Sequence, residues 1–237
     1  MYKDMTQIIF CDKSKFGHYS IPSTATAISP RAFRTCRLLT SVTLPDSVEF
    51  IGKEAFYGCS ALASIIIPNS VNEIGDGAFG DCTGLTSLTI SGDVETLGPS
   101  PFFKCEKLTD IRVVGEGENF KAVDGVLFDK KMTRIILCSK NKSGNYEIPH
   151  TVKTIDKGAF IKCENLTSIV IPESITEIPF LAFSCCSGLK TVAIPSSVTS
   201  ISPCAFNHCD DLETVSVPQG PNIPINAFPF GTAINRN

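Results

Sequence analysis

The amino-acid sequence predicts a β-rich repeat protein whose 23-residue units coil into a solenoid with a parallel strand sheet, interrupted by a hairpin-like element. Residues 67–89 and 148–170 align without a gap, and units of this length follow one another along most of the chain. One phenylalanine and one cysteine recur at fixed places in the unit, and a proline follows most of the predicted strands. Because so short a unit can bury its apolar face only against its neighbours, these periods indicate stacking.

The repeated unit reads IPxSVxxIxxxAFxxCxxLxxIx. Copies start at Ile21, Leu44, Ile67, Ile90, Ile148, Ile171 and Ile194, and a shortened copy starts at Val217. We therefore expect a single solenoid over 1–237, with four repeats in 21–112, three in 148–216 and a degenerate C-terminal cap in 217–237. The prolines of this cap are expected to stop further stacking, and deletion of 218–237 to lower solubility or melting temperature.

The last residues of each unit predict a strand of the parallel sheet. In LTSLTI, at 85–90, the alternating apolar residues suit a short strand with one buried face. The proline that follows in most units, such as Pro68, cannot donate to a strand ladder and ends the strand. The next stretch, SVNEI at 70–74, predicts a second short extended segment with its apolar residues pointing inward.

The phenylalanine and the cysteine of the unit predict two ladders inside the solenoid, because identical residues one period apart stack. The phenylalanine ladder is Phe33, Phe56, Phe79, Phe102, Phe160, Phe183 and Phe206, and the cysteine ladder is Cys36, Cys59, Cys82, Cys105, Cys163, Cys186 and Cys209. Seven cysteines in one row cannot all pair, so we interpret them as buried structural thiols. Cys11, Cys138, Cys185 and Cys204 lie outside the ladder and are better candidates for reactivity.

A longer period relates the two halves of the chain. Residues 5–22 match residues 132–149 at an offset of 127, with 11 identities in 18 positions. Between the two runs of repeats, 113–147 replaces the 23-residue unit, and Asp124-Gly125 there separates two apolar runs. This predicts a hairpin-like insertion at 113–147 and a partial copy of it at 1–20. We expect the chain to be a piece of a longer protein, or one trimmed at its start.

Charge and composition argue against several partners and cofactors. The formal net charge of −3 is spread along the chain without a cationic stripe, so nucleic acid is not expected as a partner. No apolar run is long enough to insert into a membrane, and the first residues do not read as a signal peptide. The histidines His18, His150 and His208 are expected in irregular or turn positions, and no catalytic, nucleotide or metal motif is present. We therefore expect no catalytic residues, no metal and no cofactor.

The exposed positions of the predicted strands are the candidate binding face, because solenoids bind along the surface that their strands present. This face is small, hydroxyl-rich and nearly neutral, and its members are Thr40, Thr43, Ser64, Ile66, Thr86, Ser87, Thr89, Arg112, Thr167, Ser168 and Thr191. Two interpretations stay open: a solvated strand face selected for β propensity, or weak binding summed over many units. The charged stretch 115–142, which includes Glu116 and Glu118, is likewise either architecture or a binding insertion.

The repeated unit, together with DGVLF at 124–128 and YEIP at 146–149, resembles the BspA-like leucine-rich repeats of bacterial and protist surface proteins. The resemblance covers nearly the whole chain. It implies a right-handed leucine-rich-repeat solenoid, secretion or surface display, and binding of host matrix proteins or other cells. It carries no catalytic or ligand residues. The sequence departs from the pattern at Ser91-Gly92, Pro101 and Pro179, where the local coil is expected to change.

These observations predict a non-enzymatic, secreted or cell-surface module that binds protein or glycan macromolecules of a host or a neighbouring cell. A structural spacer without a ligand of its own is the alternative, and a cytoplasmic location is the alternative to surface display. An enzymatic role would need a catalytic domain outside these 237 residues.

Overall fold

The computed structural model describes residues 6–115, 117, 119–219, 223–224 and 226–236. The chain divides into two compact units, unit 1 at 1–123 and unit 2 at 124–237, and each is described by itself. The predicted division into a partial element, four repeats, an insertion, three repeats and a cap stays a prediction. Glu116, Glu118, the first five residues and part of the expected cap lie outside the described residues.

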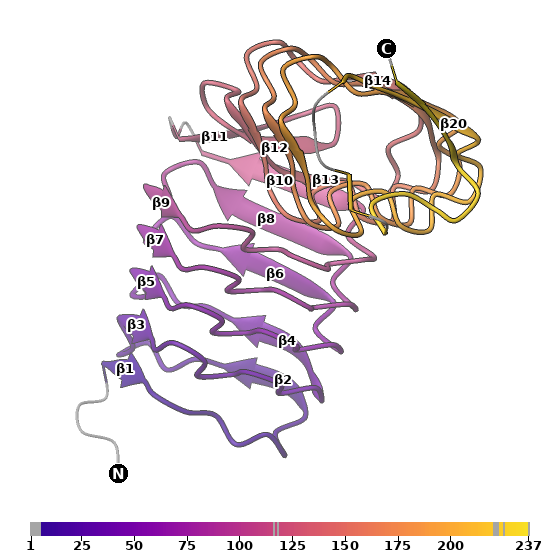
Figure 1. Cartoon of the computed structure of the whole chain (residues 1–237). Helices are drawn as coiled ribbons and strands as arrows, with labels where there is room; N and C mark the ends of the chain where they lie inside the picture. Colours follow the sequence, from indigo (N-terminus) through magenta and orange to yellow (C-terminus); the bar gives the residue numbers. More distant parts are fainter. Residues whose placement is uncertain (1–5, 116, 118, 220–222, 225, 237) are drawn as a thin grey trace. The chain divides into compact units, whose positions relative to one another are not determined.

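Unit 1 winds through two parallel sheets, which we call its main sheet and its second sheet (Figure 1). The main sheet contains β2 (Gly17–Ser20), β4 (Leu39–Thr43), β6 (Ser64–Ile67), β8 (Ser87–Ser91) and β10 (Asp110–Val114). The second sheet contains β1 (Gln7–Ile8), β3 (Ala27–Ile28), β5 (Phe50–Ile51), β7 (Glu73–Ile74) and β9 (Thr96–Leu97), and β11 (Phe120–Val123) ends the unit. Ser64 pairs with Ser87, one repeat away, so each turn adds one strand to each sheet.

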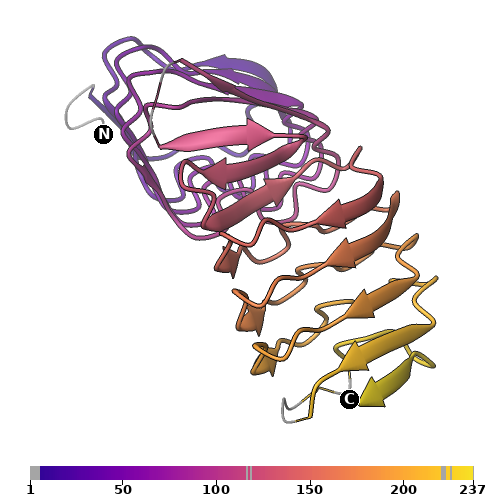
Figure 2. The same cartoon turned by 90° about the horizontal axis from the view of Figure 1, so that it is seen from above.

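Unit 2 repeats this arrangement (Figure 2). Its main sheet contains β14 (Gly144–Glu147), β16 (Leu166–Val170), β18 (Thr191–Ala193), β20 (Thr214–Val217) and β21 (Ala233–Arg236). On its other side β17 (Glu177–Ile178) pairs with β19 (Ser200–Ile201), and β13 (Arg134–Cys138) pairs with β15 (Thr154–Ile155), all in parallel. β12 (Val126–Asp129) runs antiparallel to β13 and forms the hairpin.

The predicted fold class is confirmed: the chain coils as a leucine-rich-repeat solenoid of parallel strands, interrupted by a hairpin element. The described residues form strands, turns and bends but no helix. The three departures from the repeat pattern are absorbed without breaking the coil. β8 extends to Ser91, and the carbonyls of Pro101 and Pro179 accept hydrogen bonds from Phe79 and Ala182.

The first and last turns of the units add detail to the sequence-based expectations. The back half of the insertion is a full turn of the solenoid, because β13 joins β15 and β14 joins β16 in parallel. Residues 6–20 do the same through β1 and β2. The C-terminal tail forms the last turn of the stack, since β21 pairs along all four residues with β20. Whether its prolines stop further stacking stays a prediction.

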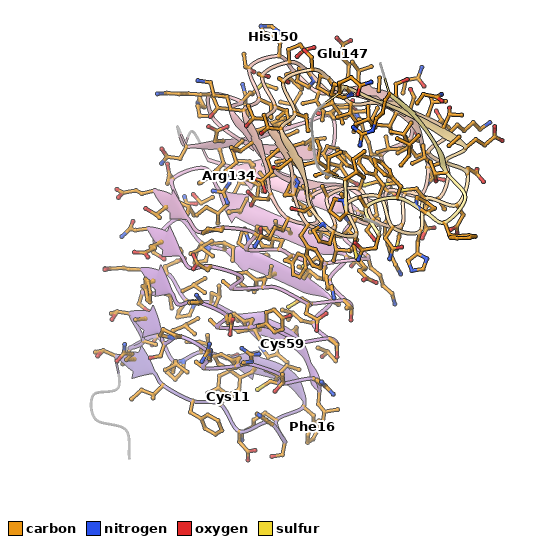
Figure 3. All side chains as sticks on the ribbon, in the orientation of Figure 1. Cys11, Phe16, Cys59, Arg134, Glu147 and His150 are labelled. Atoms are coloured by element: carbon orange, nitrogen blue, oxygen red, sulfur yellow. The ribbon has the colours of Figure 1, made fainter. Side chains whose placement is uncertain are left out.

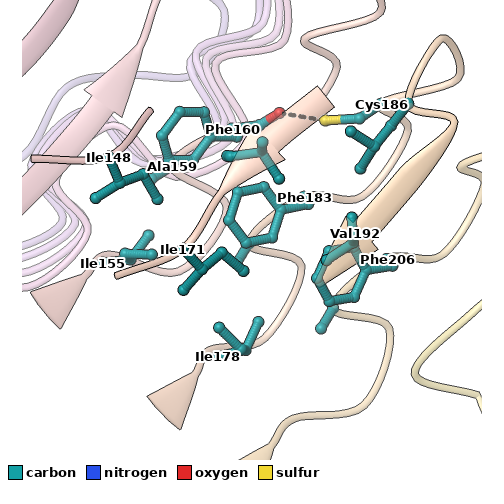
Figure 4. Close-up of a cluster of buried hydrophobic side chains, with 14 of the residues drawn as sticks. Ile148, Ile155, Ala159, Phe160, Ile171, Ile178, Phe183, Cys186, Val192 and Phe206 are labelled. Carbon is teal, nitrogen blue, oxygen red and sulfur yellow. Dashed lines mark hydrogen bonds between the residues drawn. The ribbon is translucent and has the colours of Figure 1, made fainter. Parts of the chain in front are cut away.

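Stacked phenylalanine rings run through the core of each unit. In unit 1 the stack runs through Phe33, Phe56, Phe79 and Phe102. The centroids of neighbouring rings are 4.8, 5.1 and 5.7 Å apart, and the ring planes are nearly parallel. In unit 2 the rings of Phe160, Phe183 and Phe206 lie one after another (Figure 4). Their centroids are 5.1 and 5.0 Å apart, and Phe228 continues the stack 5.0 Å from Phe206. Phe228 was missed in the sequence because the tail lacks the cysteine that follows in other units. These buried rings each contribute about 3–5 kcal/mol relative to alanine.

The ladder cysteines have a hydrogen-bonding role as well as a packing role. Five of them donate to the carbonyl of the phenylalanine 26 residues earlier: the Sγ–O distance is 3.1 Å for Cys59, Cys186 and Cys209 and 3.2 Å for Cys82 and Cys105. Figure 4 shows the bond from Cys186 to Phe160. Burial raises the pKa of the Cys59 thiol to about 12, so the proton needed for this bond stays in place at neutral pH.

Candidate binding face

The outward residues of each main sheet form continuous rows, because neighbouring strands pair in register. In unit 1 the row reads His18, Ser41, Ser64, Ser87 and Asp110, which we call the unit 1 row. In unit 2 the row reads Asn145, Ser168, Thr191, Thr214 and Ala233, which we call the unit 2 row. Because side chains alternate along a strand, the residue that follows each row position points towards the core.

His18 and Asn145 belong to these rows, although the sequence-based face did not include them. The prediction of His18 in an irregular segment is wrong, because it lies in β2. Its Nδ1 is 2.9 Å from Ser41 Oγ and its Nε2 is 2.9 Å from Ser20 Oγ. The match between 5–22 and 132–149 could have revealed both residues. Tyr19 and Tyr146 must point inward, so His18 and Asn145, which directly precede them, point outward.

The last residue of the unit 1 row, Asp110 in β10, is charged. Arg112 Nε donates to Asp110 Oδ1 at 3.0 Å, and Ser87 Oγ donates to Asp110 Oδ2 at 3.4 Å. Both charged side chains are well exposed, so their pairing adds little stability and leaves them able to meet a partner.

Several hydroxyls of the predicted face support the coil itself. Thr86 Oγ1 donates to the carbonyl of Ala63 in the preceding turn at 3.0 Å. In unit 2, Thr167 and Ser168 donate to Asn145 Oδ1 at 3.2 and 2.8 Å. These bonds fix one turn on the next, so this part of the face is architecture as well as surface. Thr40, Thr43, Ser64 and Thr191 are exposed on the same sheets.

Exposed apolar residues interrupt the polar face. Ile66 in β6 is 66% exposed, and Val170 in β16 is 54% exposed. Ile66 pairs with Thr89, which pairs with Arg112, so an apolar side chain and a guanidinium lie along one line of the unit 1 sheet. Protein interfaces favour such combinations of apolar contact and arginine.

The charged hairpin element of unit 2 is largely occupied with its own structure. Arg134 makes two 2.8 Å bonds to the Asp156 carboxylate, whose side chain is only 9% exposed. Lys142 pairs with Asp124, and its Nζ lies 4.6 Å from the Tyr146 ring centroid. Asp124, Gly125, Ser139, Asn141 and Lys142 line a polar hollow of about 340 Å³ together with Ser143 and Asn145.

Other predicted features lie apart from the face. His150 and His208 are exposed in turns, as expected, and Figure 3 shows His150 projecting outward. Cys185 and Cys204 are half-buried and have left-handed backbone conformations. No group of three metal-ligating side chains gathers among the described residues. In the same part of the chain, no helix has the length and hydropathy needed to cross a bilayer.

A family model described as the BspA type leucine-rich repeat region matches residues 3–133 and 136–235 in 6 copies. The chain belongs to this family. A search of curated proteins found no match to this BspA-type chain.

Solved structures share the fold of this BspA-type chain. The pneumococcal vaccine antigen PcpA is 22% identical with a TM-score of 0.69, over 98% of this chain and 72% of its own. A leucine-rich cell surface protein from Faecalibacterium prausnitzii is 24% identical with a TM-score of 0.51, over 94% and 87%. A leucine-rich repeat protein from Bacteroides ovatus is 24% identical with a TM-score of 0.52, over 92% and 59%.

Proposed function

We propose that the chain is a non-enzymatic binding module of a secreted or cell-surface protein, and that it binds a host or neighbouring-cell macromolecule through its main sheets. The observation that carries the proposal is the in-register alignment of outward side chains, which presents one chemical pattern over five strands in each unit. A protein of this type recognises an extended surface, because each strand adds a small contact to the same row.

The chemistry of the rows favours a polar macromolecule with some apolar contact. Hydroxyl, amide and imidazole groups can exchange hydrogen bonds with peptide or sugar groups, while Ile66 and Val170 supply exposed apolar area. The described residues of the two rows include one carboxylate, Asp110, and no lysine or arginine, so weak contacts summed over several strands are the expected mode of binding. Similarity to a vaccine antigen and to a leucine-rich cell surface protein supports placing this module outside the cell.

Surface plasmon resonance against extracellular-matrix proteins, mucins and glycans tests the proposal. The informative variant is Ser64→Lys with Thr89→Lys, which places two bulky charges on the main sheet of unit 1. Its control is Asn72→Lys with Thr96→Lys, which adds the same charge to exposed positions at the second sheet. Saturable binding that the first variant loses and the control keeps supports the proposal.

The alternative is a spacer that carries another domain away from a surface. This alternative is favoured by the hydroxyls that donate hydrogen bonds to a neighbouring turn of the coil, as Thr86 does to the Ala63 carbonyl. A spacer binds nothing in the screen, and both lysine variants then behave like the unmodified chain.

A further inference from the structure

Two cysteines stand in the solenoid where other turns carry phenylalanine. In the regular turns the phenylalanine N–H donates to the residue before the next phenylalanine, as Phe33 does to Ala55 at 2.7 Å and Phe160 to Ala182 at 2.9 Å. The N–H of Cys11 donates in the same way to Ala32 at 2.7 Å, and that of Cys138 donates to Ala159 at 2.8 Å. The first turn of each unit, at 6–22 and at 133–149, therefore places a thiol beside the first rung of the cysteine ladder.

These first rungs, Cys36 and Cys163, make longer hydrogen bonds to backbone carbonyls than the later thiols do. Cys36 Sγ is 3.9 Å from the Cys11 carbonyl oxygen, and Cys163 Sγ is 3.6 Å from that of Ser139. Cys138 Sγ approaches the same Ser139 oxygen at 3.5 Å. Two sulfur atoms thus share one carbonyl in unit 2, and the thiols of each pair also interact with one another.

Positive charge surrounds the pair in unit 2. Lys140, which is 7% exposed, donates from Nζ to the Cys138 carbonyl at 3.1 Å. Burial acts to raise the pKa of Cys163, but the Cys138 hydrogen bond and the charges of Lys140 and Lys142 outweigh it and lower that pKa. Burial raises the pKa of Cys138. The charges of Lys140 and Lys142 thus favour the thiolate form in this pair, as cationic groups do in other reactive dithiols.

Both pairs occur at the same places of the longer repeat, since Cys11 and Cys36 are each 127 residues before Cys138 and Cys163. We infer that Cys11–Cys36 and Cys138–Cys163 are two disulfide-forming pairs, oxidised in an oxidising compartment by a low-molecular-weight disulfide. Each bond ties the first turn of its unit to the first regular repeat. The inference does not depend on the proposed binding function.

The reaction is two thiol–disulfide exchanges. One protein thiol loses its proton to solvent, attacks a sulfur of the small disulfide and releases one small thiolate. The second protein thiol, deprotonated in turn, attacks the protein sulfur of the mixed disulfide and releases the other. Two protein thiols are oxidised, the small disulfide is reduced to two thiols, and the released protons balance the charge.

The test is a disulfide map of the full chain in a redox buffer of bis(2-hydroxyethyl) disulfide and its thiol. Remaining thiols are alkylated before digestion, and linked peptides are identified by mass spectrometry without reduction. We expect links from Cys11 to Cys36 and from Cys138 to Cys163. Cys59, Cys82 and the Cys186–Cys209 neighbours are expected as alkylated thiols, because phenylalanine carbonyls hold their protons.

Links scattered along the ladder, or both pairs still reduced when Cys185 and Cys204 have reacted, would overturn the inference. Melting curves provide a second measurement on the same samples. The oxidised chain should melt at a higher temperature than the reduced chain, because two loops are closed. Cys138→Ser should remove the unit 2 link and its share of this shift, whereas Cys185→Ser should leave both links in place; loss of both links in Cys185→Ser contradicts the assignment.

Discussion

The turn at 6–22 in unit 1 and the turn at 133–149 in unit 2 have the same fold and different surfaces. From residue 10 to residue 20 their differences fall on every second position, and those residues of unit 1 all point outward. The inward residues are shared: Cys11 and Cys138 are buried, and Tyr19 and Tyr146 cover Phe33 and Phe160 with centroids 5.5 and 5.8 Å apart. The inward residues therefore maintain the coil, while the outward residues vary: His18 and Ser20 in one unit correspond to Asn145 and Glu147 in the other.

The largest expected effect tests whether the two cores are equivalent. Phe56→Ala and Phe183→Ala each remove a fully buried ring from the middle of a stack, and each should lower the free energy of unfolding by about 3–5 kcal/mol. Phe230→Ala, at a fully exposed side chain, is the control and should change it by less than about 0.5 kcal/mol. Chemical denaturation measures all three. If either buried-ring substitution lowers the free energy of unfolding only slightly, the phenylalanine stack does not stabilise that unit.

The next test uses one isoleucine in two environments. Ile9 is 55% exposed, whereas Ile136, at the matching position, is 3% exposed. Ile136→Asp should cost about 2–4 kcal/mol, because it buries a carboxylate, while Ile9→Asp should cost little. Thermal melting of the two variants compares them directly. Equal losses would show that Ile9 is also covered in solution.

A smaller effect concerns an ion pair present in one unit alone. Arg134 and Asp156 of unit 2 correspond to Gln7 and Ser29 of unit 1. Arg134→Gln should cost about 1–2 kcal/mol, because it removes a bidentate partner from a mostly buried carboxylate. Adding Asp156→Ser should restore part of that loss. A double-mutant cycle by urea denaturation measures the coupling, and a coupling near zero would contradict the assigned role of this pair.

The repeat period was enough to predict the fold class, because the apolar positions leave few ways to bury every unit. It also predicted a turn at Asp124-Gly125, where both residues have left-handed φ angles, 49° and 76°. It did not predict that residues 6–20 form a complete turn, since their pattern matches the insertion rather than the regular unit. It missed Phe228 because the shortened last unit no longer aligned.

The candidate face was only partly predictable for a different reason. Alternation shows which residues point outward, so Ser64, Ile66 and Thr191 were found from the sequence. It does not show which hydroxyls bond to the neighbouring turn, because that depends on register, as for Thr86 and Thr167. The place of His18 beside Ser41 likewise follows from strand pairing rather than from spacing.

The most direct test of the binding face is photo-cross-linking. A photoreactive amino acid replaces Ser64 on the main sheet of unit 1 or, as the matched control, Thr96 on the second sheet. Each variant is irradiated with the matrix protein or mucin that binds most strongly in the resonance screen. The account predicts cross-linking from position 64 and little from position 96; equal or stronger cross-linking from position 96 would contradict it.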